Sequence, residues 1–133
     1  MSIPRKPRTP DELLESLIGD RLVSVSFVLN DYVQLQFDEA SMNIEVFPRI
    51  VTSERTWSES ELGYADVFRR LGGQDVIAAS ERMGDGLRIT FGTGQIHIDP
   101  AYEEIAVEIA TLRVADSRWM CWRPGEGPFR HLG

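Results

Sequence analysis

The chain has 133 residues, of which 42% are hydrophobic and 26% charged, and these values predict one domain with its own apolar core. The formal net charge is −7, and the body after the first ten residues is more acidic still, with 11 basic against 21 acidic residues. An acidic body disfavours binding to nucleic acid or to an anionic membrane and favours a basic partner.

The first half of the chain predicts a tail, a short helix and several strands. Residues 1–8 are rich in proline and basic side chains and predict a flexible basic tail. An apolar stripe at helical spacing predicts a helix over 10–18, which Gly19 ends. A Val- and Phe-rich segment at 21–29 predicts a strand. Alternating apolar and polar residues predict further strands at 32–37, 42–47 and 50–52.

The second half repeats this order after a linker at 53–64. Apolar residues between Leu62 and Leu71 predict the buried side of a second helix, which a Gly-Gly pair ends. Residues 102–114 fit either a helix or a strand, and their β-branched content favours a strand. Other strands are predicted at 74–80, 87–91, 96–98 and 118–123, and the segment 124–128 is predicted to end regular structure.

The two halves align with each other. The apolar positions of 33–37 match those of 87–91 at a spacing of 54 residues, and those of 44–48 match 96–100 at a spacing of 52. This change predicts that the first hairpin loop is two residues longer, because insertions are tolerated best at turns.

The alignment predicts an α+β fold built by duplication. We expect a single domain over 9–133 that contains two α-β-β-β repeats, at about 10–52 and 62–123. Short hairpin connections require mainly antiparallel pairing. The units would therefore form a mainly antiparallel sheet or a half-open barrel, covered in part by two short helices.

The sequence contains no complete catalytic or cofactor-binding motif. The Gly-x-Gly triplets lack the context of a phosphate-binding loop and predict turns. His97 and Asp99 share the outward face of a predicted strand, where a solvated histidine is expected. Cys121 lies between two tryptophans and is expected to be a small buried residue, not a nucleophile. We therefore predict no enzyme activity, no cofactor and no metal site.

Aromatic residues beside acidic residues are the strongest functional signal. Trp57 and Tyr64 flank Glu59 and Glu61, and Trp and Tyr are favoured anchors at protein interfaces. The other two tryptophans are three positions apart on one predicted strand, so they point to opposite faces. The predicted partner-binding residues are Trp57, Glu59, Glu61, Tyr64, Trp119 and Trp122.

The order of motifs resembles a family of small, uncharacterised, actinobacterial-type proteins with two L-x-G … L-x-F-x-x-G-x-L-x-I-x-P units. The resemblance covers about 13–128, and the turn of the first unit lacks the family glycine. It implies no known activity, and associates the chain only weakly with immunity proteins. The matching residues are Leu17, Gly19, Leu35, Phe37, Ile44, Val46 and Pro48, then Leu71, Gly73, Leu87, Ile89, Phe91, Gly94, Ile96, Ile98 and Pro100, with Pro124 and Gly125 at the end.

These observations favour a non-enzymatic cytoplasmic binding protein that masks a cationic protein such as a toxin. The alternative is a small-ligand-binding or regulatory domain that uses the concavity of the sheet. An exposed edge strand would also permit a homodimer. No apolar run approaches the roughly 18 residues that cross a bilayer, no secretory signal is recognised, and a lone cysteine fits the reducing cytoplasm.

Overall fold

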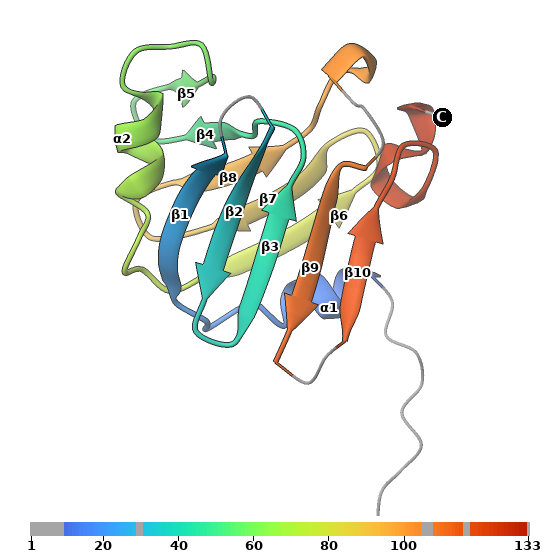
Figure 1. Ribbon diagram of the computed structural model, residues 1–133, viewed down its shortest axis with the longest axis horizontal. Coiled ribbons are helices and arrows are strands. Elements are labelled where there is room, and N and C mark those ends of the chain that lie inside the picture. The colour runs from blue at the N-terminus through green and yellow to red at the C-terminus, as the bar shows by residue number, and fades with distance from the viewer. Residues whose placement is uncertain (1–9, 29–30, 105–107, 116–117, 133) are drawn as a thin grey trace, which may run out of the picture.

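The computed structural model describes residues 10–28, 31–104, 108–115 and 118–132. The predicted basic tail at 1–8 therefore lies outside the described residues. The described chain forms two antiparallel sheets of five strands each, with a few short helices. Figure 1 shows one sheet in front of the other, with the strands of the two sheets running across each other. The strands are antiparallel as predicted, but they form two sheets, where one sheet or a half-open barrel was predicted.

The first sheet has the order β1-β2-β3-β9-β10. Its strands are β1 (Leu22–Val28), β2 (Tyr32–Phe37), β3 (Ala40–Ile44), β9 (Ala110–Val114) and β10 (Trp119–Trp122). The second sheet has the order β5-β4-β8-β7-β6. Its strands are β4 (Arg49–Val51), β5 (Thr56–Trp57), β6 (Ala78–Arg82), β7 (Gly86–Thr90) and β8 (Gln95–Ile98).

The two sheets exchange strand pairs. The hairpin β4–β5 follows β3 in the chain, but β4 pairs with β8 in the second sheet. Conversely, β9 and β10 follow β8, but β9 pairs with β3 in the first sheet. Each three-stranded meander is therefore completed by two strands from the other half of the chain. Figure 1 shows this exchange as orange strands beside the blue and teal ones.

The meanders β1–β2–β3 and β6–β7–β8 have the same register. Leu35 pairs with Met42, and Ile89 pairs with Ile96, so equivalent partners lie 54 positions apart on both sides of each turn. The prediction that the first loop is two residues longer is wrong. The structural equivalent of Ile96 is Met42, not Ile44, because both turns close over the same number of residues.

Several element bounds differ from the sequence prediction. Strand β3 ends at Ile44, not Phe47, and β6 begins at Ala78, not Gln74. The ambiguous segment 102–114 is divided into a 3₁₀ helix and β9, with 105–107 outside the described residues. The C-terminal segment has turns at 124–126, as predicted, and is followed by 3₁₀ turns that are interrupted by a kink at Phe129. These 3₁₀ segments are η1 (Tyr102–Glu104) and η2 (Gly127–Leu132).

Two short helices pack on the first strand of the opposite meander. Helix α1 (Pro10–Glu15) contacts β6, and α2 (Tyr64–Arg69) contacts β1. The predicted helices were longer, but each is followed by turns up to Gly19 or Gly73, both of which have positive φ. Large apolar side chains fill the core, including Phe37, Phe68, Phe91, Trp122 and Phe129. None of the described helices is long and apolar enough to cross a membrane.

Candidate functional site

A groove lies where α2 meets the end of β1. It has a volume of about 300 Å³. Its walls come from the end of β1, from the segment after β3, and from the loop that leads into α2. The lining residues are Phe27, Val28, Phe47, Glu59, Glu61, Leu62, Gly63, Tyr64 and Ala65. The groove therefore combines an apolar wall with two carboxylates.

Local turn chemistry places the loop that forms one wall. The Glu61 carboxylate accepts the Ser58 backbone N–H at 2.9 Å, which is one half of a capping box. The helix nevertheless begins later, at Tyr64, after Gly63 with φ of 93°. A Cβ at Gly63 would also lie 3.3 Å from the Trp57 ring, so this tight approach favours glycine. Leu62 consequently precedes the helix and does not join its buried side.

Leu62 is the largest departure from the predicted burial. The sequence pattern placed it on the buried face of the helix, but 99% of its surface is exposed. Phe27 and Phe47 are half-buried and pack against the core from the same groove. Sequence reasoning missed all three as site residues, because alternation and helical spacing assign them to ordinary core positions.

Tyr64 lies in the lining of the groove, and its hydroxyl proton is already used in a hydrogen bond within the chain. Its hydroxyl donates a 2.5 Å hydrogen bond to the buried Pro48 carbonyl. Burial raises the pKa of Tyr64 well above its usual range, and the nearby Glu59 charge raises it further. The ring meets Phe68 edge-on at 5.7 Å, and Phe27 meets Phe68 at 5.6 Å. This aromatic cluster fixes the apolar wall.

Trp57 and Glu61 both contact Arg55 of the same chain. The Arg55 guanidinium lies 4.2 Å from the centre of the Trp57 ring. The same guanidinium forms an ion pair with Glu61. Glu59 is exposed at the groove, where its charge contributes to the raised Tyr64 pKa. Of the four predicted residues near this site, Glu59 is therefore the best placed for a partner.

The other two predicted residues lie on β10, in the first sheet. Trp119 is exposed and Trp122 is buried in the core. Their opposite orientation follows from their odd spacing on a strand. The lining of the groove contains neither of them. The structure thus places Glu59, Glu61 and Tyr64 in the groove lining. Trp57 lies outside the lining, with its ring beside Gly63, and the two β10 tryptophans lie in the first sheet.

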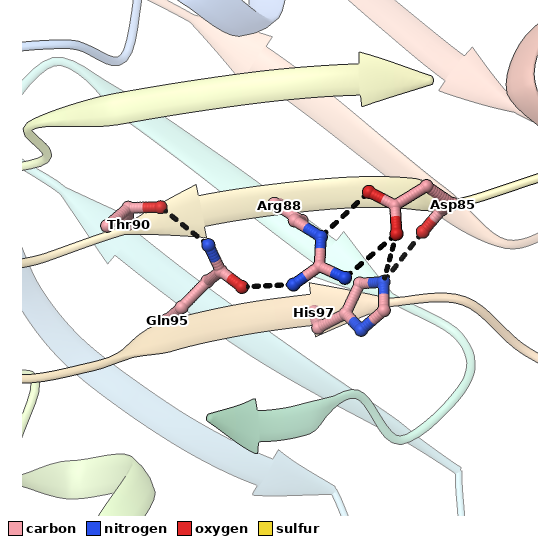
Figure 2. A network of polar contacts seen from close by, with 5 residues as sticks. All are labelled: Asp85, Arg88, Thr90, Gln95 and His97. Atoms are coloured by element: carbon pink, nitrogen blue, oxygen red, sulfur yellow. Dashed lines mark hydrogen bonds and ion pairs between the residues drawn. The ribbon is translucent and has the colours of Figure 1, made fainter. Parts of the chain in front are cut away.

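A network of polar side chains lies on β7 and β8 and in the turn before β7 (Figure 2). Arg88 binds both carboxylate oxygens of Asp85, at 2.7 and 2.8 Å. It also donates to the Gln95 side chain, which donates to Thr90. Its hydrogen bonds are therefore directed to neighbouring side chains, and we interpret the network as support for the β7–β8 hairpin.

His97 completes this network and corrects a prediction. It was expected to be solvated beside Asp99, but it is 7% exposed. Its Nε2 lies 2.6 Å from the Asp85 backbone oxygen and 3.6 Å from the Asp85 carboxylate. Because a carbonyl oxygen only accepts hydrogen bonds, Nε2 carries the proton. The imidazole thus anchors the turn before β7.

The network predicts a pH-dependent contribution to stability. The hydrogen bond from Arg88 holds the pKa of Asp85 below its usual range. The contribution of the Asp85 carboxylate to stability is therefore complete above the pKa of an unfolded aspartate, near 3.9. It is lost as the pH falls through the lower pKa that Asp85 has in the folded protein. We expect Asp85→Asn to lower the free energy of unfolding at neutral pH by about 1 kcal/mol, a value reduced for partial exposure.

Urea denaturation at several pH values would measure this difference. The difference in the free energy of unfolding between wild type and Asp85→Asn should disappear as the pH falls below the usual pKa range of aspartate. The exposed Asp31→Asn is the matched control and should change stability by less than about 0.5 kcal/mol. A gap that persists undiminished at low pH would contradict the role of the Asp85 charge.

The free cysteine, Cys121, is buried on β10. Burial raises the pKa of the Cys121 thiol, whose side-chain neighbours include Thr111 and Glu108. A raised pKa disfavours the thiolate that a nucleophile needs. No group of three or more metal-ligating side chains converges among the described residues.

Comparison with protein-family models, with curated proteins and with solved structures found no match for this chain. The resemblance to the duplicated actinobacterial-type family therefore stays a prediction.

Proposed function

We propose that this chain is a non-enzymatic binding protein, and that its groove receives an apolar side chain from a basic protein partner. The observation that carries the proposal is Leu62, which is 99% exposed at the edge of an apolar groove. A single exposed leucine is ordinary, but one beside Phe27 and Phe47 extends an apolar surface that a partner can cover.

The charge around the groove supports a basic partner. Glu59 is exposed at the groove, and the body of the chain carries ten more acidic than basic residues. Such a field accelerates encounter with a cationic protein and disfavours acidic competitors. The best-fitting ligand segment thus places a large apolar side chain next to lysine or arginine. A surface of this kind suits an immunity-like protein that masks a cationic toxin.

The groove is favoured over the sheet concavity as the binding site. Buried side chains from both sheets form one core cluster, so they occupy the space between the sheets. The groove instead opens to solvent beside α2, and its 300 Å³ is at the lower end of the range for small-ligand sites. Its size fits one or two side chains of a peptide better than a large cofactor.

We also propose that the fold arose by internal duplication and that the protein is cytoplasmic. The constant offset of 54 residues between the two meanders supports duplication. The exchange of β4–β5 with β9–β10 then explains why the repeats are not separate domains. The single, buried and unpaired Cys121 supports a reducing compartment.

A random-peptide display selection on the purified protein tests the groove. We expect enriched peptides with a large apolar residue next to a basic one, and affinity that falls as salt rises. Leu62→Lys should weaken a selected peptide at least about tenfold, and Glu59→Gln roughly threefold. Met83→Lys changes an exposed apolar residue in the loop before β7 and should leave binding unchanged.

Amide chemical shifts report where such a peptide binds. Perturbations should centre on Phe27, Leu62 and Ala65, which line the groove. Peptides that enrich without a basic residue, or that perturb only Trp119 and its neighbours, would refute the proposed site. Binding of small apolar molecules in preference to peptides would favour the alternative, a small-ligand-binding domain.

A further inference from the structure

The short ribbon that joins the two sheets has a second exposed apolar surface. It consists of residues 19–23 and 73–77, which run antiparallel and meet at the bridge between Arg21 and Asp75. The Gly19 amide donates to Val76 at 2.8 Å, and the Gly73 amide donates to Leu22 at 2.7 Å. These two bonds have the same 54-residue offset as the meanders, so the ribbon has an approximate twofold axis through its bridge.

The outer face of the ribbon carries two exposed apolar side chains and two glycines. Val23 is 51% exposed and Ile77 is 60% exposed, while Leu22 and Val76 point into the core. The opposite segment begins in each case with a glycine in a turn, which is Gly73 for Val23 and Gly19 for Ile77. The exposed outward positions are Gly19, Arg21 and Val23 on one segment, and Gly73, Asp75 and Ile77 on the other.

The glycines leave open space beside the two apolar side chains. A Cβ added at Gly19 or Gly73 would meet nothing within 4 Å. The Gly19 amide bonds to the residue before Ile77, and the Gly73 amide bonds to the residue before Val23. Each exposed side chain is therefore next to a hollow of the ribbon. The central bridge carries the exposed Arg21 and Asp75, and the Arg21 guanidinium also lies 3.5 Å from the Asp38 carboxylate of its own chain.

We propose that a second copy of this chain docks on the ribbon about a twofold axis parallel to its strands. Rotation about that axis places Val23 of one copy over Gly73 of the other, and Ile77 over Gly19. The same rotation places each Arg21 opposite an Asp75. The surface is thus complementary to itself in both shape and charge, as an isologous interface requires.

The charges select this axis over its perpendicular alternative. A twofold axis across the strands would also place Val23 and Ile77 over glycines. It would, however, set Arg21 against Arg21 and Asp75 against Asp75, and like charges at close range oppose association. This dimer uses the outer face of the ribbon, which includes the first two residues of the edge strand β1. It shares no residue with the groove lining, so it is independent of the proposed function.

Sedimentation velocity from about 1 μM to about 1 mM, a range that covers weak dimers, tests the proposal. We expect the wild type to dimerise within this range. Val23→Lys and Ile77→Lys should each raise the dimer dissociation constant at least about tenfold, because every isologous contact occurs twice. Met83→Lys and Leu62→Lys alter exposed apolar residues outside the ribbon and should leave the dimer dissociation constant unchanged.

A mixing experiment separates the interface from folding. Arg21→Asp and Asp75→Arg should each remain folded by circular dichroism and be monomeric alone, because each creates two repulsive contacts in its own dimer. Mixed in equal amounts, they should form a heterodimer, because every contact then joins opposite charges. A wild type that stays monomeric, or a dimer indifferent to Val23→Lys and Ile77→Lys, would overturn the proposal. A mixture that stays monomeric would overturn the pairing of Arg21 with Asp75.

Discussion

Replacing Gly86 with alanine is expected to lower the free energy of unfolding by about 4 kcal/mol, because two costs combine at this position. Gly86 has φ of 82°, a conformation that side chains disfavour. An added Cβ would also lie 2.1 Å from the Ile98 backbone oxygen. That oxygen belongs to the neighbouring strand, so relief of the overlap requires separation of β7 from β8.

Gly84→Ala is the matched control for this prediction. Gly84 has φ of 80°, but a Cβ there would meet nothing within 4 Å. Its cost should be only the conformational one, about 1 kcal/mol. Urea denaturation followed by tryptophan fluorescence would measure both variants. Equal losses at the two positions would contradict the close approach of Gly86 to Ile98.

Replacing Phe68 with alanine is expected to lower the free energy of unfolding by about 4 kcal/mol. Phe68 is fully buried on α2 and makes edge-on contacts with Phe27 and Tyr64. Truncation removes buried apolar surface and leaves a cavity beneath the groove. Because Phe27 and Tyr64 rest on this ring, the variant should also bind a groove-directed peptide more weakly.

Leu62→Ala separates the loss of stability from the loss of peptide binding, which Phe68→Ala is expected to combine. Its side chain is almost fully exposed, so its removal should change stability by less than about 0.5 kcal/mol. It should nevertheless weaken peptide binding, because it removes apolar surface from the groove. Comparison of the denaturation midpoint and the peptide affinity for both variants checks this. A large stability loss for Leu62→Ala would show that the loop before α2 packs differently.

The sequence predicted several strands well because alternation is a local property. β2 was predicted at its observed bounds, and β1, β4 and β10 within a residue at each end. Gly19 and Gly73, predicted to end the helices, both have positive φ. The predicted bounds were wrong where pairing with a neighbouring strand decides the end of a strand. For example, β3 begins at Ala40, directly after the turn, because its pairing with β2 continues to Gln36.

The candidate site was predicted only in part. Trp57, Glu59, Glu61 and Tyr64 were named from composition, and the structure places them near one groove. Their different environments could not be inferred, because the hydrogen bond from Tyr64 to Pro48 and the packing of Phe27 join residues that are distant in sequence. The buried His97 was missed because its partner, Asp85, lies in the turn before β7.

The sequence by itself determined where most of the strands lie, which face of each is apolar, and where glycine permits a turn. It also contained the 54-residue periodicity that both meanders follow. Only the tertiary structure decided that β4 joins β8 and that β9 joins β3. The physical reason is that alternation specifies a buried face but not a neighbour, since any antiparallel strand offers the same backbone donors and acceptors. The choice of neighbour depends on packing across the whole core, and that choice creates both the groove and the ribbon.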